Sequence, residues 1–252
     1  MPVFDLNKPV LQRMKILLSC ACLAVLIALA PCQKACARVF VLNTFDVYPY
    51  STPKGTGTLD LIIKEAFRRI GQQVKIVWLP SKRAVINADQ GIDDGDFVRV
   101  KGLEKVYHHL VMVPEKLCRF EFSAFVKDPS IRISGRESLK AYNVGIPRGS
   151  QILENTVTKV RSLTKVNDQN ALFELLINGR IDVAVYDRRQ GYGLMKACGI
   201  TGIRAAGPVL LRSDMYIYLN RRYAGYVPRL AAAIRQMKQD GTFRRIMEAG
   251  PL

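Results

Sequence analysis

The chain has few histidines and lacks the common catalytic signatures. Among its 252 residues it has one tryptophan and two histidines, His108 and His109. Adjacent residues on a helix or strand point in different directions, so these histidines do not suit a shared metal ion. The signatures G-x-S-x-G and H-E-x-x-H are missing, and no G-K-S/T follows the glycines at 55–58. The sequence therefore predicts no metal site, no cofactor and no enzyme.

Acidic residues are also scarce, with 21 against 38 basic residues and a formal net charge of +17. The basic residues are scattered and are not interleaved with aromatic residues, unlike those of a nucleic-acid-binding surface. Hydrophobic residues make up 49% of the chain, an ordinary globular composition that argues against disorder. We expect no nucleic-acid partner. The basic excess fits a solvated basic surface, with a preference for anionic ligands or an anionic membrane surface as the alternative.

Long apolar runs are confined to the first 37 residues. A basic start at Met14-Lys15 precedes an apolar run over 16–30, and Ala35-Cys36-Ala37 supplies a cleavage site. This order predicts a secretory signal peptide over 1–37 and a periplasmic location. A lipoprotein signal ending at Cys32 is an open alternative, although the proline before that cysteine fits it poorly.

Cysteine is scarce once the signal is removed. The first 37 residues contain four of the six cysteines, together with four basic residues and one acidic residue, which leaves a net charge of +14. Only Cys118 and Cys198 remain. A disulfide is possible in an oxidising compartment, but it needs a particular Cα separation that sequence does not give. We expect two separate, half-buried thiols and leave the pairing open.

Strand and helix patterns alternate through the rest of the chain. In the first half we expect strands over 39–43, 74–79 and 95–100 and helices over 59–70 and 80–91. In the second half we expect strands over 143–146, 163–167 and 181–185, a helix from Gly149 and a helix capped by Asp168. A helix from Pro228 and a short final helix close the chain. The alternation predicts an α/β fold with parallel sheets.

Two long extended stretches link the halves, one over 117–125 and one over 210–220. They predict two βα sheets joined by two crossing hinge strands. Residues 38–120 would form the first part of lobe one, 121–212 lobe two, and 213–252 the return to lobe one. A ligand cleft is expected between the lobes, at the strand ends where α/β sheets bind ligands.

One phrase occurs twice, at Ala88–Arg99 and at Ile177–Asp187. Each copy has a helix-ending glycine, an aspartate three residues later (Asp94, Asp182) and then a strand. The aspartates fit structural turns. Eight residues after each glycine stands a charged residue, Arg99 in the first copy and Asp187 in the second. A cation and an anion at matching strand ends suit a small zwitterion, whereas an ion pair with Arg188 or Arg189, or a helix cap, is the alternative role of Asp187.

Aromatic residues accompany these strand ends. Tyr48 and Tyr50 follow the first strand and Trp78 ends the second, so we expect them to face the cleft. They would stack on a ligand there or pack into the core.

The order of these motifs resembles the type II periplasmic solute-binding proteins of the polar amino-acid ABC-transporter branch. The resemblance is carried by the aromatic-proline loop, the repeated G-x-x-D strands, VGIPRGS, NGRIDVAVYD and MKQDGTFRRI. It implies that Arg148, Gly149 and Ser150 form the turn that holds a ligand carboxylate, and that Asp187 holds the amino group. A helix start at Gly149-Ser150 would offer free N–H groups to an anion.

One segment departs from that family. Asp94–Val98 stands where a serine-rich run usually precedes the carboxylate-binding arginine, and Glu104 lies near the usual position of that arginine. We take Arg99 as its substitute from the internal repeat. The phrase LPSKRAVINADQGIDDGD resembles an orphan subgroup without an obvious ligand class.

The sequence thus predicts a monomeric, exported solute-binding protein that closes on a small polar ligand, an amino acid or a small carboxylate. The resemblance implies a membrane permease as partner. Two alternatives remain, a cyclohexadienyl-dehydratase-like enzyme on the same scaffold and a ligand sensor without transport.

Overall fold

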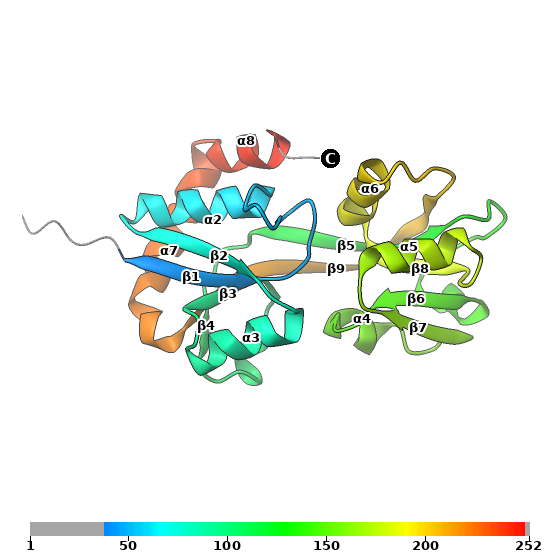
Figure 1. Cartoon of the computed structure of the whole chain (residues 1–252), viewed down its shortest axis with the longest axis horizontal. Coiled ribbons are helices and arrows are strands. Elements are labelled where there is room, and N and C mark those ends of the chain that lie inside the picture. The colour runs from blue at the N-terminus through cyan, green and yellow to red at the C-terminus, as the bar shows by residue number, and fades with distance from the viewer. Residues whose placement is uncertain (1–37, 250–252) are drawn as a thin grey trace, which may run out of the picture. The chain divides into compact units, whose positions relative to one another are not determined.

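The computed structural model describes residues 38–249, so the predicted signal peptide over 1–37 lies outside the described residues. Strands and helices alternate along them (Figure 1). The strands are β1 (Val39–Thr44), β2 (Gln73–Trp78), β3 (Gly95–Val100), β4 (Leu110–Met112), β5 (Cys118–Val126), β6 (Asn143–Pro147), β7 (Ser162–Val166), β8 (Val183–Asp187) and β9 (Arg204–Asn220). The helices are α2 (Thr58–Arg69), α3 (Ser81–Gln90), α4 (Gln151–Thr156), α5 (Gln169–Ile177), α6 (Arg188–Ala197), α7 (Val227–Gln239) and α8 (Thr242–Ala249).

The strands form one sheet in the order β2-β1-β3-β9-β5-β8-β6-β7, with β4 also paired to β9. β1 is parallel to β2 and β3, and β6 is parallel to β7 and β8. Between these groups, β5 and β9 are antiparallel to each other and to their neighbours. The predicted fold of two βα sheets joined by two crossing strands is confirmed, and β5 and β9 make the two sheets continuous.

We call β1–β4 with α2, α3, α7 and α8 the first lobe, and β6–β8 with α4–α6 the second lobe. The predicted boundaries after residues 120 and 212 fall inside β5 and β9, so the chain passes between the lobes within strands. In the first lobe α2, α7 and α8 pack on one another, while α3 packs on β1 and β3 (Figure 1).

Helix α2 forms because its apolar residues recur at helical spacing on one face. Leu59, Ile62 and Phe67 on that face are fully buried. At its start the Asp60 carboxylate accepts a hydrogen bond from the Gly57 N–H at 2.9 Å. The helix ends before Gly71, whose φ of +73° is a left-handed conformation that favours glycine.

The repeated G-x-x-D phrase has the same structural role in both lobes. The Asp94 carboxylate accepts from the backbone N–H of Val41 in β1 at 2.9 Å, and the Asp182 carboxylate accepts from that of Asn143 in β6 at 2.8 Å. Each aspartate therefore ties the start of one strand to its parallel neighbour. The interpretation of both as structural turn residues is confirmed.

Three expectations need correction. β9 begins at Arg204 rather than at 210, because the strand resumes its pairing with β5 beyond an irregularity that contains Gly207 and Pro208. β8 runs from Val183 to Asp187 rather than over 181–185, because Asp182 is used in the turn. Cys118 and Cys198 are separate thiols as expected, but one is buried and the other exposed.

No helix between residues 38 and 249 combines the length and the apolar character needed to cross a membrane.

Candidate functional site

A cavity of about 520 Å³ lies where β5 passes between the lobes, and elements of both lobes line it. This volume lies in the range of small-molecule sites. The first lobe contributes the loop after β1 and helix α8, the second lobe contributes the start of α6, and β5 forms the floor. The lining residues are Tyr50, Leu117, Cys118, Arg119, Glu121, Asp187, Arg188, Arg189, Tyr192, Gly193, Phe243 and Met247.

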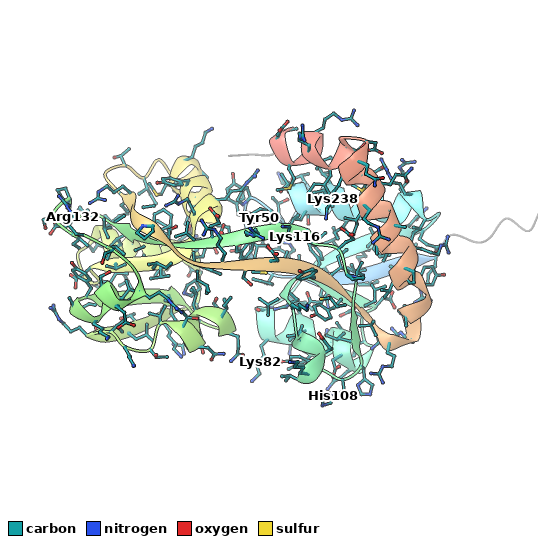
Figure 2. All side chains as sticks on the ribbon, turned by 180° about the vertical axis from the view of Figure 1, so that it is seen from behind. Tyr50, Lys82, His108, Lys116, Arg132 and Lys238 are labelled. Atoms are coloured by element: carbon teal, nitrogen blue, oxygen red, sulfur yellow. The ribbon has the colours of Figure 1, made fainter. Side chains whose placement is uncertain are left out.

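Tyr50 is the aromatic residue of the cavity that comes from the loop after β1. Its ring stacks on Phe120 of β5 with centroids 5.3 Å apart, and only 3% of the residue is exposed. In Figure 2 Tyr50 is labelled in the middle of the molecule, where β5 and β9 run between the lobes. Burial raises the pKa of its hydroxyl above the ordinary value, so it is neutral and acts as an apolar wall with a polar tip.

Asp187 ends β8 and caps α6. Its Oδ1 accepts from the backbone N–H of Gln190 at 3.0 Å, and its Oδ2 accepts from the backbone N–H of Glu121 at 2.8 Å. Only 1% of the residue is exposed. Burial raises the pKa of the carboxyl to about 6, although the backbone hydrogen bonds act in the opposite direction. Of the two alternative roles that the sequence leaves open, the helix cap is the one present.

The other charged residues of the cavity fall into two groups. On β5, Arg119 pairs with Asp214 at 2.7 Å, and Glu121 pairs with Arg212 at 2.8 Å. At the start of α6, the Arg188 Nε donates to Ser123 Oγ at 3.2 Å, and the Arg189 Nη2 donates to the Met247 carbonyl at 2.9 Å. The β5 charges are thus neutralised by partners, and the α6 arginines bind neutral groups.

Two glycines let α6 approach both lobes closely. A Cβ at Gly191 would lie 2.4 Å from the Phe125 ring, and one at Gly193 would lie 3.3 Å from Pro49 of the loop after β1. Glycine in a helix interior costs about 1 kcal/mol relative to alanine. The close contacts give these positions a packing reason, and Gly193 brings the loop of the first lobe against the second.

Arg99 does not line this cavity. Its guanidinium binds Asp96 at 2.6 Å and both the hydroxyl and the carbonyl of Ser81, and it lies 4.7 Å from the centroid of the Phe45 ring. Residues three apart on a regular strand point to opposite faces. A bulge at Val98, whose φ is +65°, reverses the alternation and brings Arg99 to the face of the buried Asp96.

The predicted carboxylate turn also lies apart from the cavity, and it has a carboxylate of its own. The Gly149 N–H donates to Glu154 Oε1 at 2.8 Å, and Glu154 Oε2 pairs with Lys165 at 3.1 Å. Arg148 donates to Asn167 and to the Lys165 carbonyl. Ser150 is the N-cap residue of the short α4 without a side-chain cap. Glu154 therefore holds the N–H group that was predicted for a ligand.

Tyr48 lies in the loop after β1, and Trp78 at the end of β2 contacts that loop. The Tyr48 ring comes within 3.4 Å of the Cβ position of Gly193, so it packs against α6. The Trp78 indole N–H donates to Ser51 Oγ at 2.9 Å. Neither residue lines the cavity.

The lobes also touch through a chain of polar side chains outside the cavity. The Gln169 amide at the start of α5 donates to the Asp46 carboxylate in the loop after β1. The Tyr186 hydroxyl in turn lies 3.2 Å from Gln169 Oε1 and 2.9 Å from Gln190 Oε1. This chain connects the first lobe to the capped start of α6.

The structure thus brings two of the predicted site residues, Tyr50 and Asp187, to one cavity. Sequence reasoning missed Arg119, Glu121, Phe243 and Met247, and treated Arg188 and Arg189 only as partners of Asp187. Alternation along β5 puts Arg119 and Glu121 on one face of the strand, and helical spacing puts Phe243 and Met247 on one face of α8. The sequence thus contains both patterns, but it does not show that the strand and the helix line the same cavity.

The histidines lie elsewhere. His108 and His109 are exposed next to β4, and Figure 2 places His108 far from Tyr50. Among residues 38–249 no group of three histidine, cysteine or acidic side chains is close enough to hold a metal ion.

No family model matches the sequence. An uncharacterised protein of Shewanella oneidensis is 24% identical over 193 residues, which cover 74% of this chain and 73% of that protein.

Solved structures resemble the fold over most of the chain. A histidine kinase sensor domain with similarity to periplasmic binding proteins has a TM-score of 0.75 at 16% identity, covering 84% of this chain and 95% of that chain. An ancestral arginine-binding protein bound to glutamine has a TM-score of 0.70 at 19% identity, covering 83% and 96%. An amino acid ABC transporter substrate-binding protein from Streptococcus pneumoniae bound to L-arginine has a TM-score of 0.70 at 13% identity, covering 84% and 93%.

Proposed function

Because this chain has the two-lobed fold of the type II periplasmic binding proteins, we propose that it is an exported solute-binding protein that captures a small polar ligand between its lobes. One observation carries the proposal. Segments far apart in sequence, the loop at Tyr50, strand β5, the start of α6 and helix α8, meet around one cavity of about 520 Å³. A cavity between lobes is the usual place for a small ligand in α/β proteins.

The ligand class is an amino acid or a small carboxylate. Charged side chains of both signs and the rings of Tyr50, Tyr192 and Phe243 line the cavity. Such walls exchange hydration of a polar ligand for fixed hydrogen bonds and charges. The other residues predicted from the sequence do not line the cavity as it stands. They remain predicted ligand contacts in a more tightly closed arrangement of the lobes: Arg99, Arg148, Gly149, Ser150, Tyr48 and Trp78.

Closure would occur about β5 and β9, the two strands that run through both lobes. The contacts of Asp46 with Gln169 and of Arg189 with the Met247 carbonyl connect the lobes. A ligand that binds both walls of the cavity favours the closed arrangement by its differential affinity.

A thermal-shift screen of amino acids and small carboxylates tests the proposal. A ligand at about 100 times its Kd stabilises a protein by about 2.7 kcal/mol. For a chain of this size that corresponds to a rise in melting temperature of about 5–10 °C. If no small polar compound raises the melting temperature, the proposal fails.

A cavity variant locates the ligand. Phe243→Ala removes a half-buried ring from the cavity wall and is expected to weaken binding roughly tenfold. Val106→Ala, at an exposed apolar residue outside the cavity, serves as the control and is expected to bind as the unchanged protein does. Equal loss in both variants, or in neither, would put the ligand elsewhere.

Capture of a ligand could serve transport or sensing, since a sensor domain and a transporter substrate-binding protein share this fold. We propose transport with a membrane permease. Uptake of labelled ligand by cells should then be lost when the gene is deleted, whereas a sensor would leave uptake unchanged. Recovery of the bound compound unchanged, by mass spectrometry, separates binding from the enzyme alternative.

A further inference from the structure

The cavity wall at the start of α6 carries two arginines whose charges are not neutralised by the chain. Within the described residues 38–249, the only side-chain hydrogen bonds of Arg188 and Arg189 go to the Ser123 hydroxyl and the Met247 carbonyl, which are both neutral groups. Of the other charged residues of the cavity, Arg119 and Glu121 each have an ion-pair partner on β9, and Asp187 forms no ion pair within residues 38–249. Two unpaired arginines thus face one carboxylate. The surplus charge in the cavity is therefore positive.

Arg189 has a further feature that points to a ligand. Its Nε is buried and has no hydrogen-bond partner among the described residues. A buried donor without an acceptor costs about 1–3 kcal/mol, and such groups are rare in native structures. The guanidinium lies 5.5 Å from the centroid of the Tyr50 ring, at the border between the two lobes. An anion in the cavity would supply the acceptor that this nitrogen lacks.

Asp187, the carboxylate predicted to hold an amino group, offsets at most one of these two positive charges and is not free to bind a ligand. Both of its oxygens accept backbone N–H groups, and 1% of the residue is exposed. A ligand ammonium group would have to displace the cap of α6 to reach it. Glu121 is the other carboxylate of the cavity, and Arg212 pairs with it.

We infer that the ligand of this cavity is a small organic anion, held through its carboxylate by Arg188 and Arg189, and that it needs no ammonium group. This inference rests on the proposed function and names its ligand class. Arginine suits this role because its planar guanidinium binds a carboxylate with two parallel hydrogen bonds. The rings of Tyr50, Tyr192 and Phe243 would pack against the carbon skeleton.

Matched pairs of compounds that differ by one ammonium group test the inference. Isothermal titration of the full mature chain with glutarate against glutamate, and with succinate against aspartate, is expected to give equal or tighter binding for the acid without the amine. If the amino acid of either pair binds ten times tighter, the inference is wrong and the proposed function stands. If neither these compounds nor any other small polar compound binds, the proposed function fails and the inference fails with it.

Charge variants assign the contact. Arg189→Gln is expected to weaken dicarboxylate binding roughly 10- to 100-fold, the effect of losing a charged hydrogen bond. Arg132→Gln makes the same change on an exposed arginine that Figure 2 shows far from Tyr50, and it should bind as the unchanged protein does.

Glu121→Gln gives a test of opposite sign that does not depend on the folding of the Arg189 variant. Removal of this negative charge from the cavity is expected to tighten dicarboxylate binding severalfold. Unchanged affinity in Arg189→Gln, or weaker dicarboxylate binding in Glu121→Gln, would overturn the inference.

Discussion

At the scale of single residues, Asp187 combines two features that act on its pKa in opposite directions. Burial disfavours the charged form, while the backbone donors of Gln190 and Glu121 favour it. Burial outweighs the hydrogen bonds, and the pKa rises to about 6. The ordinary value in an unfolded chain is about 3.9. Between about pH 4 and pH 6 the folded protein therefore keeps a proton that the unfolded chain has lost.

This difference predicts how stability depends on pH. The contribution of Asp187 is fully present below about pH 4 and is lost as the pH rises to about 6. Asp187→Asn removes the titration but leaves the Glu121 N–H without its acceptor. The variant should therefore be less stable than the unchanged protein at pH 4, and the gap should shrink by up to about 3 kcal/mol by pH 7. Urea unfolding at four pH values measures this.

The neighbouring titration of Asp96 does not confuse the comparison. Burial raises the pKa of Asp96 to about 6 as well, but that carboxyl is present in both proteins and cancels in the difference. A gap that stays constant or widens with pH would mean that the hydrogen bonds, not burial, determine the pKa of Asp187.

Val98 has a backbone conformation that a β-branched residue rarely adopts, with φ at +65°. A left-handed conformation costs a residue with a Cβ about 1–2 kcal/mol, and glycine avoids this cost. Val98→Gly should therefore be more stable than Val98→Ala by about 1 kcal/mol in urea unfolding. At Val100 of the same strand, where φ is not positive, the order of the two variants should reverse. If the glycine variant were more stable than the alanine variant at both positions, the backbone of Val98 would not be strained.

The sequence identified individual charged residues more successfully than it identified which residues meet in the site. The repeat identified Arg99 and Asp187 as charged residues at matching chain positions, but it did not show their partners. Asp96 and Ser81 bind Arg99, and that contact depends on the bulge at Val98. The sequence does not indicate this bulge, because the residue with the positive φ is a valine and not a glycine. The partners of Asp187 are backbone groups, which every sequence contains.

At the scale of elements, the helices and most strands followed from periodicity because each buries one regular face. The strand over 95–100 is present with the expected bounds. β9 was predicted too short, since Gly207 and Pro208 indicate a break, whereas tertiary pairing with β5 continues on both sides of them. Local signals cannot include a partner strand that lies about 80 residues earlier in the chain.

The turn before α4 allows the predicted carboxylate site to be tested against the cavity. Glu154 accepts from the Gly149 N–H, and this bond together with Lys165 lowers the pKa of Glu154 below its ordinary value. Glu154→Ala frees that N–H group. If the cavity holds the ligand, the variant should bind with unchanged affinity and lose at most about 1 kcal/mol of stability, as for a surface ion pair. Isothermal titration and urea unfolding measure the two effects.

A matched variant completes that experiment. Glu137→Ala removes an exposed glutamate that also pairs with a lysine, Lys140, and that has no bond to the Gly149 turn. Tighter anion binding in Glu154→Ala than in Glu137→Ala would place the ligand at the turn, as the family resemblance implies.

At the scale of the whole molecule, two strands carry all covalent connection between the lobes, and side chains supply the rest of the contact. β5 and β9 pair along both lobes, so a change in their twist moves one lobe against the other. The Asp46–Gln169 hydrogen bond is made outside these two strands and joins the loop after β1 to α5. Contacts of this kind bias the balance between open and closed arrangements.

Loss of that contact should weaken capture. Gln169→Ala removes a hydrogen bond to a charged group that forms only when the lobes meet, so we expect roughly 3- to 10-fold weaker binding through faster dissociation. The single tryptophan, Trp78, reports on the same loop because its indole N–H binds Ser51. The fluorescence emission of Trp78 should change when ligand binds. On dilution, the emission should return to its starting value faster in Gln169→Ala than in the unchanged protein, because the ligand dissociates faster. Gln151→Ala, at an exposed glutamine of α4, should behave like the unchanged protein. Slower release in Gln169→Ala would mean that the contact opposes closure on the ligand.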